Sequence, residues 1–133
     1  MPNGLKKKES RARSKILVVD DDWAIVELLK FTLTSWDFEV SVARSEEEFR
    51  RGVFECRPDL IVLDIMLGDK NGVETYQALL NEGFDPKVPV VFLTVLAKDV
   101  STTPPQPGRT FALVAKPFDP EKLAKEITCL IEG

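Results

Sequence analysis

The sequence predicts an α/β fold in which a doubly wound, five-stranded parallel sheet carries helices on both faces. The chain has 133 residues, 44% of them hydrophobic and 30% charged, which suits one compact domain. Short apolar runs rich in valine and isoleucine alternate with longer amphipathic stretches. Continuous apolar runs of this length are typical of strands buried on both faces of a parallel sheet.

Five strands are expected. Three are continuous apolar runs, and the second and fifth are weaker. In chain order they are Ile16 to Val19, Phe38 to Val42, Leu60 to Leu63, Val90 to Leu93 and Phe111 to Ala115.

The stretches between the strands have the apolar periodicity of helices. The first three helices are expected at Trp23 to Ser35, Glu46 to Cys56 and Val73 to Asn81. Ser45 and Glu48 form a capping box at the second helix, and Asp119 followed by Pro120 begins the last one. Gly52 is discordant, because glycine inside a helix costs roughly 1 kcal/mol relative to alanine.

The helix before the last strand is expected to be shortened or irregular. Pro104, Pro105 and Pro107 fall where this helix would run. Proline removes a backbone donor and clashes with the preceding turn, so three of them cannot lie inside a helix.

Composition excludes several classes of protein. There is no histidine, which rules out histidine-based zinc sites and histidine general bases. The two cysteines, Cys56 and Cys129, lie far apart, which indicates free thiols in a reducing compartment. No apolar run approaches the roughly 20 residues that span a bilayer. We therefore expect a cytoplasmic protein without membrane contact.

Charge divides the chain into two expected regions: a basic, disordered leader at residues 1–14 and a folded domain at residues 15–133. The leader holds five basic residues and one acidic residue, whereas the whole chain has a net charge of −4. The folded domain is therefore acidic and repels phosphate backbones, so nucleic-acid binding is not expected.

Polar residues follow four of the expected strands. Asp20, Asp21 and Asp22 come after the first strand, Asp64 after the third, Thr94 after the fourth and Lys116 after the fifth. The carboxyl ends of parallel strands form the ligand site of such sheets. Clustered carboxylates repel one another unless a cation is bound, and oxygen ligands favour Mg²⁺. We interpret Asp22 as the N-cap of the first helix.

These residues resemble the motifs of the receiver domains of two-component response regulators. Lys15 to Asp21 is similar to the acidic pair after the first strand, and Leu60 to Leu67 to the phosphoacceptor strand. Gly72, Thr94 and Lys116-Pro117-Phe118 also stand where the family has them. The resemblance covers about residues 15 to 131 and implies a flavodoxin-like (βα)5 fold with strand order 2-1-3-4-5.

The resemblance also implies roles. Asp64 would be phosphorylated by a sensor histidine kinase or a histidine phosphotransfer protein. Asp20, Asp21, Asp64 and the backbone carbonyl of Met66 would hold Mg²⁺, and Thr94 and Lys116 would contact the phosphoryl group. The domain would catalyse only its own phosphotransfer and autodephosphorylation, and would relay the signal by a conformational change to an unknown target or output domain.

Three departures from the family pattern bear on this signal. Leu113 replaces the usual switch aromatic, for which Phe111 is a candidate substitute. Val95 is larger than the usual residue after the threonine and would narrow the approach to Asp64. The prolines interrupt the surface that relatives use to dimerise or to contact an output domain.

Two alternative functions stay open at this point. The first is a pseudo-receiver, an interaction module that works without phosphorylation. The second is a haloacid-dehalogenase-like phosphohydrolase, but that class needs an acid two residues after the nucleophile, where this chain has Met66. Whether the chain is a stand-alone regulator or part of a longer protein also stays open.

Overall fold

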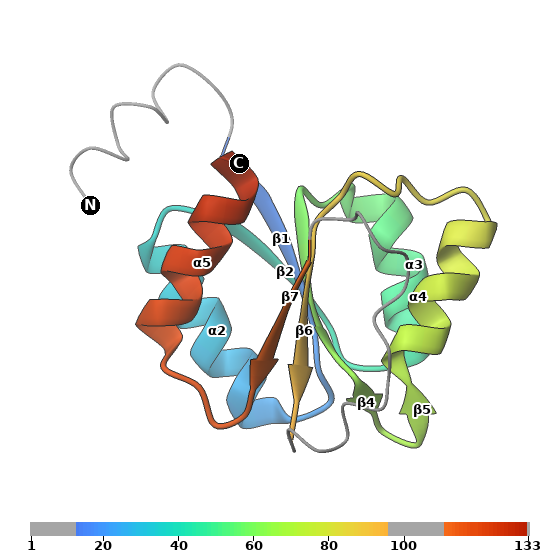
Figure 1. Cartoon of the computed structure of the whole chain (residues 1–133), viewed down its shortest axis with the longest axis horizontal. Helices are drawn as coiled ribbons and strands as arrows, with labels where there is room; N and C mark the ends of the chain where they lie inside the picture. Colours follow the sequence, from blue (N-terminus) through green and yellow to red (C-terminus); the bar gives the residue numbers. More distant parts are fainter. Residues whose placement is uncertain (1–12, 96–110, 133) are drawn as a thin grey trace.

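The computed structural model describes residues 13–95 and 111–132, and these form one α/β layer structure (Figure 1). Its strands are β1 (Lys15–Val19), β2 (Glu39–Ala43), β3 (Leu60–Asp64), β4 (Met66–Leu67), β5 (Lys70–Asn71), β6 (Val90–Thr94) and β7 (Phe111–Ala115). Its helices are α2 (Trp23–Ser35), α3 (Glu46–Cys56), α4 (Gly72–Asn81) and α5 (Pro120–Glu132).

The main sheet has five parallel strands in the order β2-β1-β3-β6-β7. This confirms the predicted 2-1-3-4-5 order. All five strands therefore end at the same edge, at the bottom of Figure 1. Beside that edge, β4 and β5 form a small antiparallel pair, which we did not predict because two-residue strands carry no measurable periodicity.

The core has two layers, one on each face of the sheet (Figure 1). Leu17 and Val19 of β1 point to the layer under α3 and α4, which includes Phe49 and Tyr76. Ile16 and Val18 point to the layer under α2 and α5. Because alternate residues of each central strand enter different layers, both faces must be apolar, as the sequence pattern indicated.

Three predicted helix caps are confirmed. The Asp22 side chain accepts a hydrogen bond from the Ala24 N–H at 2.9 Å. Ser45 Oγ accepts from the Glu48 N–H, which confirms the cap, but the Glu48 carboxylate accepts from the N–H of Arg44 and not from that of Ser45, so the return bond of the predicted capping box is shifted by one residue. Asp119 accepts from the Glu121 N–H. These bonds satisfy amide groups that a helix leaves without internal partners.

The second strand begins one residue later than predicted. Phe38 is buried, but its N–H donates to the carbonyl of Leu33 in α2. This bond makes Phe38 part of the turn that ends the helix, so the pairing with β1 begins at Glu39.

Parts of two predictions lie outside the described residues, namely positions 1–12 of the leader and the shortened helix within residues 96–110. The last two leader residues are described. Arg13 forms an ion pair with Asp37, and the Ser14 carbonyl accepts from the Glu39 N–H. Among the described helices, none has the length and hydropathy needed to cross a membrane.

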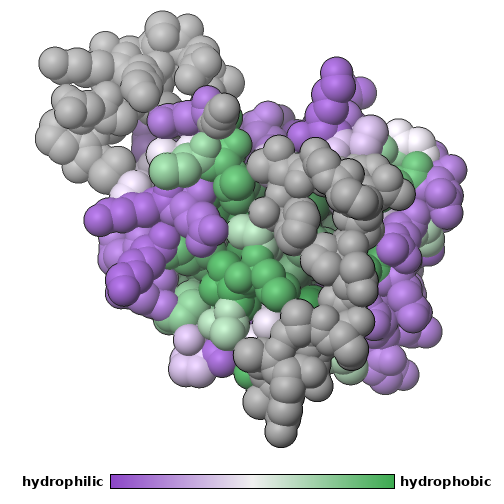
Figure 2. Space-filling view, in the orientation of Figure 1, coloured by the Kyte–Doolittle hydropathy of each residue, from purple (hydrophilic) through white to green (hydrophobic). Residues whose placement is uncertain are grey.

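The face that carries β7 exposes apolar surface. In the space-filling view, apolar residues gather in the middle of this face, and the outer side of α5 beside them is hydrophilic (Figure 2). Leu113 of β7 contributes to the exposed apolar side chains, being 40% exposed.

Candidate functional site

The strand order brings the predicted polar residues together. Asp20 directly follows β1, Asp64 ends β3, Thr94 ends β6, and Lys116 directly follows β7. Because β1, β3, β6 and β7 are consecutive neighbours in the sheet, these positions lie in a row along its carboxyl edge. The row is extended by one further ladder bond, from the Lys116 N–H to the Thr94 carbonyl at 2.7 Å.

Lys116 joins the two buried carboxylates of the site. Its Nζ lies 2.8 Å from Oδ2 of Asp20 and 3.5 Å from Oδ2 of Asp64. Asp20 is 0% exposed and Asp64 is 3% exposed. Buried carboxylates are costly without compensating charge, so the ammonium group stabilises a cluster that would otherwise repel itself.

Asp64 has a perturbed acidity. Burial and the neighbouring charge of Asp20 raise its pKa to about 7, against the opposing effects of Lys116 and of the Met66 N–H. This N–H donates to Asp64 Oδ1 at 3.1 Å. Burial by itself would lower the pKa of Lys116, but its contacts with Asp20 and Asp64 outweigh burial and raise it. Lys116 is therefore a permanent positive charge, whereas Asp64 changes charge near neutral pH.

Three carboxylates at this edge are arranged so that they can hold a metal ion. Asp20, Asp21 and Asp64 each offer an oxygen atom, and these atoms lie within 4.8 Å of one another. Asp21 is exposed, whereas the other two are buried. A donor set made only of carboxylate oxygens fits a hard cation such as Mg²⁺.

Asp22 does not join this cluster. Its side chain caps α2, and its own N–H donates to Asp20 Oδ1 at 2.9 Å. The Asp22 carboxylate therefore caps α2, as we predicted. The backbone N–H of Asp22 also orients the Asp20 side chain, which we did not predict.

Gly72 packs directly against the strand that carries Asp64. Its N–H donates to the Ile65 carbonyl at 2.6 Å. A Cβ atom at this position would overlap the carbonyl oxygen of Asp64 and lie 3.2 Å from the Leu63 side chain. Glycine is therefore required here for the close approach of two backbone segments.

The other residues singled out in the sequence lie around the site. Thr94 is buried, and Val95, which follows it, is 56% exposed. Met66 opens β4, next to Asp64. The Phe111 side chain lies outside the described residues, so its proposed switching role stays a prediction.

One contact beside the site had no signal in the sequence. The guanidinium carbon of Arg44 lies 4.8 Å from the centre of the Trp23 ring, which is a cation–π distance. Trp23 begins α2 soon after β1, and Arg44 directly follows β2. The ends of these neighbouring strands are joined by a hydrogen bond from the Asp20 N–H to the Ala43 carbonyl, which brings Trp23 and Arg44 close together.

A parallel sheet of this order, with an acidic cluster and a lysine at its carboxyl edge, defines a class of α/β domain. A comparison with protein-family models identifies the family within that class. The model of the response regulator receiver domain matches residues 16–128, and the chain belongs to this family. It is a signalling domain rather than a classical enzyme, and its place is in two-component signalling.

Relatives agree with this assignment. The chain is 34% identical over 115 residues to the DNA-binding response regulator MtrA of Mycolicibacterium smegmatis, a match that covers 86% of this chain and 49% of the relative. It is 30% identical over 117 residues to the alkaline phosphatase synthesis transcriptional regulatory protein PhoP of Bacillus subtilis, covering 88% of this chain and 48% of the relative. The chain thus spans about half the length of these curated relatives.

Solved structures show the same fold. The BeF3-activated receiver domain of DrrB is 30% identical, with a TM-score of 0.76 over 91% of this chain and 99% of that chain. The chemotaxis response regulator CheY4 of Vibrio cholerae is 25% identical, with a TM-score of 0.75 over 90% and 99% of the two chains.

Proposed function

We propose that Asp64 accepts a phosphoryl group in a Mg²⁺-dependent reaction, with a sensor histidine kinase or a histidine phosphotransfer protein as donor. The proposal rests on the surroundings of the Asp64 side chain. Asp64 is a buried carboxylate at the end of a strand. One of its oxygens accepts a hydrogen bond from the Met66 N–H, and the other lies 3.5 Å from the Lys116 ammonium. This arrangement positions a nucleophile beside a fixed positive charge.

In the proposed transfer, a carboxylate oxygen of Asp64 forms a bond to phosphorus while the bond from phosphorus to the donor's imidazole nitrogen breaks. The carboxylate must be deprotonated to attack, and its pKa of about 7 allows this at neutral pH. Lys116 would pair with the negative phosphoryl oxygens, and the Thr94 hydroxyl would donate a hydrogen bond to one of them. Such transfers depend mainly on positioning and charge neutralisation.

Asp20, Asp21 and Asp64 would hold the Mg²⁺, with the backbone carbonyl of Met66 as a further ligand. The bound ion supplies positive charge that offsets the charge of the carboxylates and of the phosphoryl group. The oxygen-only donor set of the cluster supports this choice of metal.

The phosphorylated domain would then signal by a conformational change to a target protein or to an output domain. The two relatives described above are DNA-binding or transcriptional regulators by name, which supports an output of this kind in a longer protein. Contact between nucleic acid and the receiver domain itself is not part of the proposal. Leu113, which replaces the family's switch aromatic and is 40% exposed, favours the pseudo-receiver as the second candidate.

Intact-mass spectrometry separates the two candidates. After incubation with acetyl phosphate and Mg²⁺, we expect one added phosphoryl group, which is absent with EDTA and in Asp64→Asn. Asp59→Asn is the matched control, because it changes a carboxylate at the other end of the same strand and should leave the modification intact. A chain that takes up no phosphoryl group from acetyl phosphate or from a histidine donor would be a pseudo-receiver.

A further inference from the structure

The segment that follows Asp64 is too short to hold its own position. β4 and β5 form a ladder of two residue pairs, Met66 with Asn71 and Leu67 with Lys70. A pair of strands this short is not stable by itself in water. The Met66 N–H donates to Asp64 Oδ1 at 3.1 Å, so the position of this ladder directly affects the proposed phosphoacceptor. Other parts of the chain must therefore fix the ladder in place.

The first turn of α4 fixes the ladder on one side. Asn71 belongs to β5 and also caps α4, because its side-chain oxygen accepts two backbone N–H groups of the helix. The N–H of the next residue, Gly72, donates to the Ile65 carbonyl at 2.6 Å. No Cβ atom fits between Gly72 and the Asp64 carbonyl oxygen. A displacement of the first turn of α4 therefore moves the backbone around Asp64.

A buried hydroxyl group holds this turn against α3. Thr75 is 4% exposed, and its Oγ1 donates a hydrogen bond at 2.8 Å to Oε2 of Glu46, the first residue of α3. The same Oγ1 lies 3.4 Å from the Asn71 carbonyl, so without Glu46 the hydroxyl would turn to its own helix. A hydrogen bond to a carboxylate is stronger than one between neutral groups. This bond joins the beginnings of α3 and α4, beside the acidic site.

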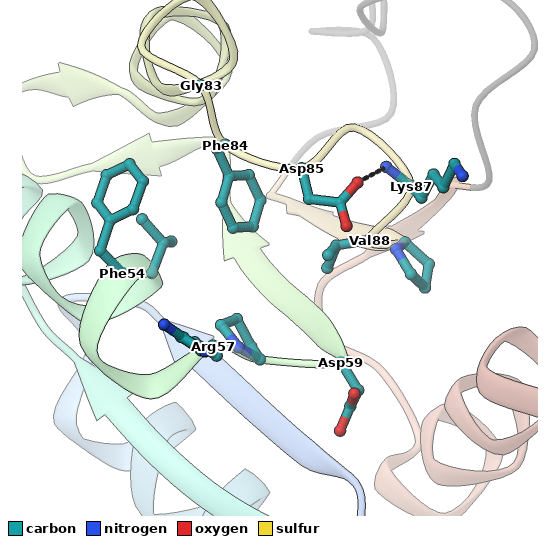
Figure 3. A pocket seen from close by; sticks show the side chains of 11 residues that line it. Phe54, Arg57, Asp59, Gly83, Phe84, Asp85, Lys87 and Val88 are labelled. Atoms are coloured by element: carbon teal, nitrogen blue, oxygen red, sulfur yellow. Dashed lines mark hydrogen bonds between the residues drawn. The ribbon is translucent and has the colours of Figure 1, made fainter.

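The other ends of α3 and α4 are joined more weakly. Arg50 pairs with Glu82 at 2.9 Å, but these side chains are 37% and 49% exposed, and exposed ion pairs contribute little to stability. Farther along both helices, a groove opens between the end of α3 and the loop after α4, lined in part by Phe54 and Phe84 (Figure 3). Phe54 is 48% exposed. Of these contacts, the buried hydroxyl bond is the one that water weakens least.

We propose that Glu46 and Thr75 are positioning residues for the phosphoacceptor site. Their hydrogen bond holds the first turn of α4, and through it β4, so that the Met66 backbone meets the Asp64 carboxylate. The two side chains act through Asn71 and Met66 and not by contact with the phosphoryl group. The consequence for Mg²⁺ binding rests on the proposed function, in which the Met66 carbonyl is a ligand of the ion.

The test compares substitutions that remove this hydrogen bond with substitutions that keep it. Thr75→Val and Glu46→Ala remove it, whereas Thr75→Ser keeps the donor and Glu46→Gln keeps an acceptor. In the ¹⁵N-labelled full chain in EDTA, the Met66 and Gly72 amides should exchange hydrogen about three-fold or more faster in the first two variants. Thr75→Ser and Glu46→Gln should stay close to wild type.

Calorimetry gives the second readout. Thr75→Val and Glu46→Ala should each weaken Mg²⁺ binding about three-fold or more, which is less than the loss of about 10- to 100-fold that follows removal of a group bonded directly to a metal ligand. Because both variants remove the same bond, the double variant should bind no more weakly than either single one. If the charge of Glu46 were responsible, Glu46→Gln would behave like Glu46→Ala.

Two matched variants act as controls. Arg50→Gln removes the exposed ion pair between the same two helices. Thr128→Val repeats the loss of a hydroxyl group on α5, where Oγ1 donates to the Ala124 carbonyl at 2.9 Å. Both should keep wild-type exchange at Met66 and Gly72 and wild-type Mg²⁺ affinity. Urea unfolding of each variant verifies that it is folded.

Three results would overturn the inference: unchanged exchange or unchanged Mg²⁺ affinity in Thr75→Val, equal changes in the controls, or a Glu46→Gln variant that matches Glu46→Ala. A wild-type chain that binds no Mg²⁺ would instead contradict the metal part of the proposed function. The exchange of the Met66 and Gly72 amides in EDTA would then decide the inference alone.

Discussion

The ammonium group of Lys116 hydrogen-bonds to Asp20, at 2.8 Å, across 96 positions of sequence. Both partners are largely withdrawn from water, their side chains being 14% and 0% exposed. The same ammonium lies 3.5 Å from Asp64. Lys116 therefore has a structural role, neutralising Asp20, in addition to its proposed contact with the phosphoryl group.

Lys116→Met should destabilise the domain by about 3 kcal/mol, because it leaves buried carboxylates without their counter-charge. Urea unfolding at neutral pH in EDTA measures this loss. Added Mg²⁺ should recover part of it, because the ion replaces the missing positive charge. Lys125→Met, the same change at an exposed position of α5, should stay within about 0.5 kcal/mol of wild type. Equal stability of the two variants would contradict a structural role for Lys116.

Asp64 should make stability decrease as pH rises. Its pKa is about 7 in the folded state and 3.8 in the absence of these contacts. The Asp64 carboxyl therefore binds its proton more tightly in the folded state than in the unfolded state. The stability that this protonation contributes is fully present below about pH 4 and is lost as pH rises through 7. In EDTA, Asp64→Asn should gain stability relative to wild type between about pH 5 and pH 8, on the order of 2 kcal/mol.

The control for this pH series is Asp69→Asn, which removes an exposed carboxylate outside the cluster. Its difference from wild type should stay constant across the same range. The Asp64 argument fails if the gain of Asp64→Asn does not grow with pH.

Two glycine-to-alanine substitutions should have opposite effects. At Gly52 a Cβ atom would lie 3.6 Å from the Leu17 methyl groups, an ordinary contact, so Gly52→Ala should stabilise α3 by up to about 1 kcal/mol. At Gly72 the Cβ atom would overlap the Asp64 carbonyl oxygen, so Gly72→Ala should cost about 1–3 kcal/mol. Thermal unfolding of both variants tests the pair, and a loss at Gly52 would show that its neighbours cannot accept a methyl group.

Trp23 should report metal binding by its fluorescence. Trp23 lies two residues after Asp21, so we expect a change at the acidic cluster to alter the surroundings of its ring. The guanidinium carbon of Arg44 lies 4.8 Å from the centre of that ring. Titration with Mg²⁺ in a Trp36→Phe background should change the emission, and Asp21→Asn should reduce the response. Mg²⁺ binding detected by calorimetry with constant emission would refute the expectation.

The regular elements of the fold were predictable because each has its own local pattern. The bounds of α2 and α3 agree with the prediction residue for residue, since Asp22 and Ser45 are strong caps followed by clear apolar periodicity. The exceptions have local causes too. Phe38 reads as strand by residue type, yet its backbone closes the turn after α2.

The site was predictable as a group of residues but not in its internal contacts. Strand-end position placed Asp20, Asp64, Thr94 and Lys116 together. It gave no indication that Lys116 approaches Asp20 more closely than Asp64, because side-chain distances depend on packing in three dimensions. The groove around Phe54 and Phe84 was not predicted, since its residues come from segments about 30 positions apart with no shared spacing.

The helix cap at Asp22 has a consequence for mutational tolerance. Serine, threonine or asparagine can perform the capping that Asp22 performs, so this position is free to change within that small set. Asp20 and Asp21 lack this freedom if they bind the ion. Deletion of one residue from Asp20-Asp21-Asp22 would leave two aspartates for three roles, and it would shorten the link between β1 and α2. The three consecutive aspartates therefore have different roles, and an alignment with relatives must match each of them to the position that has the same role.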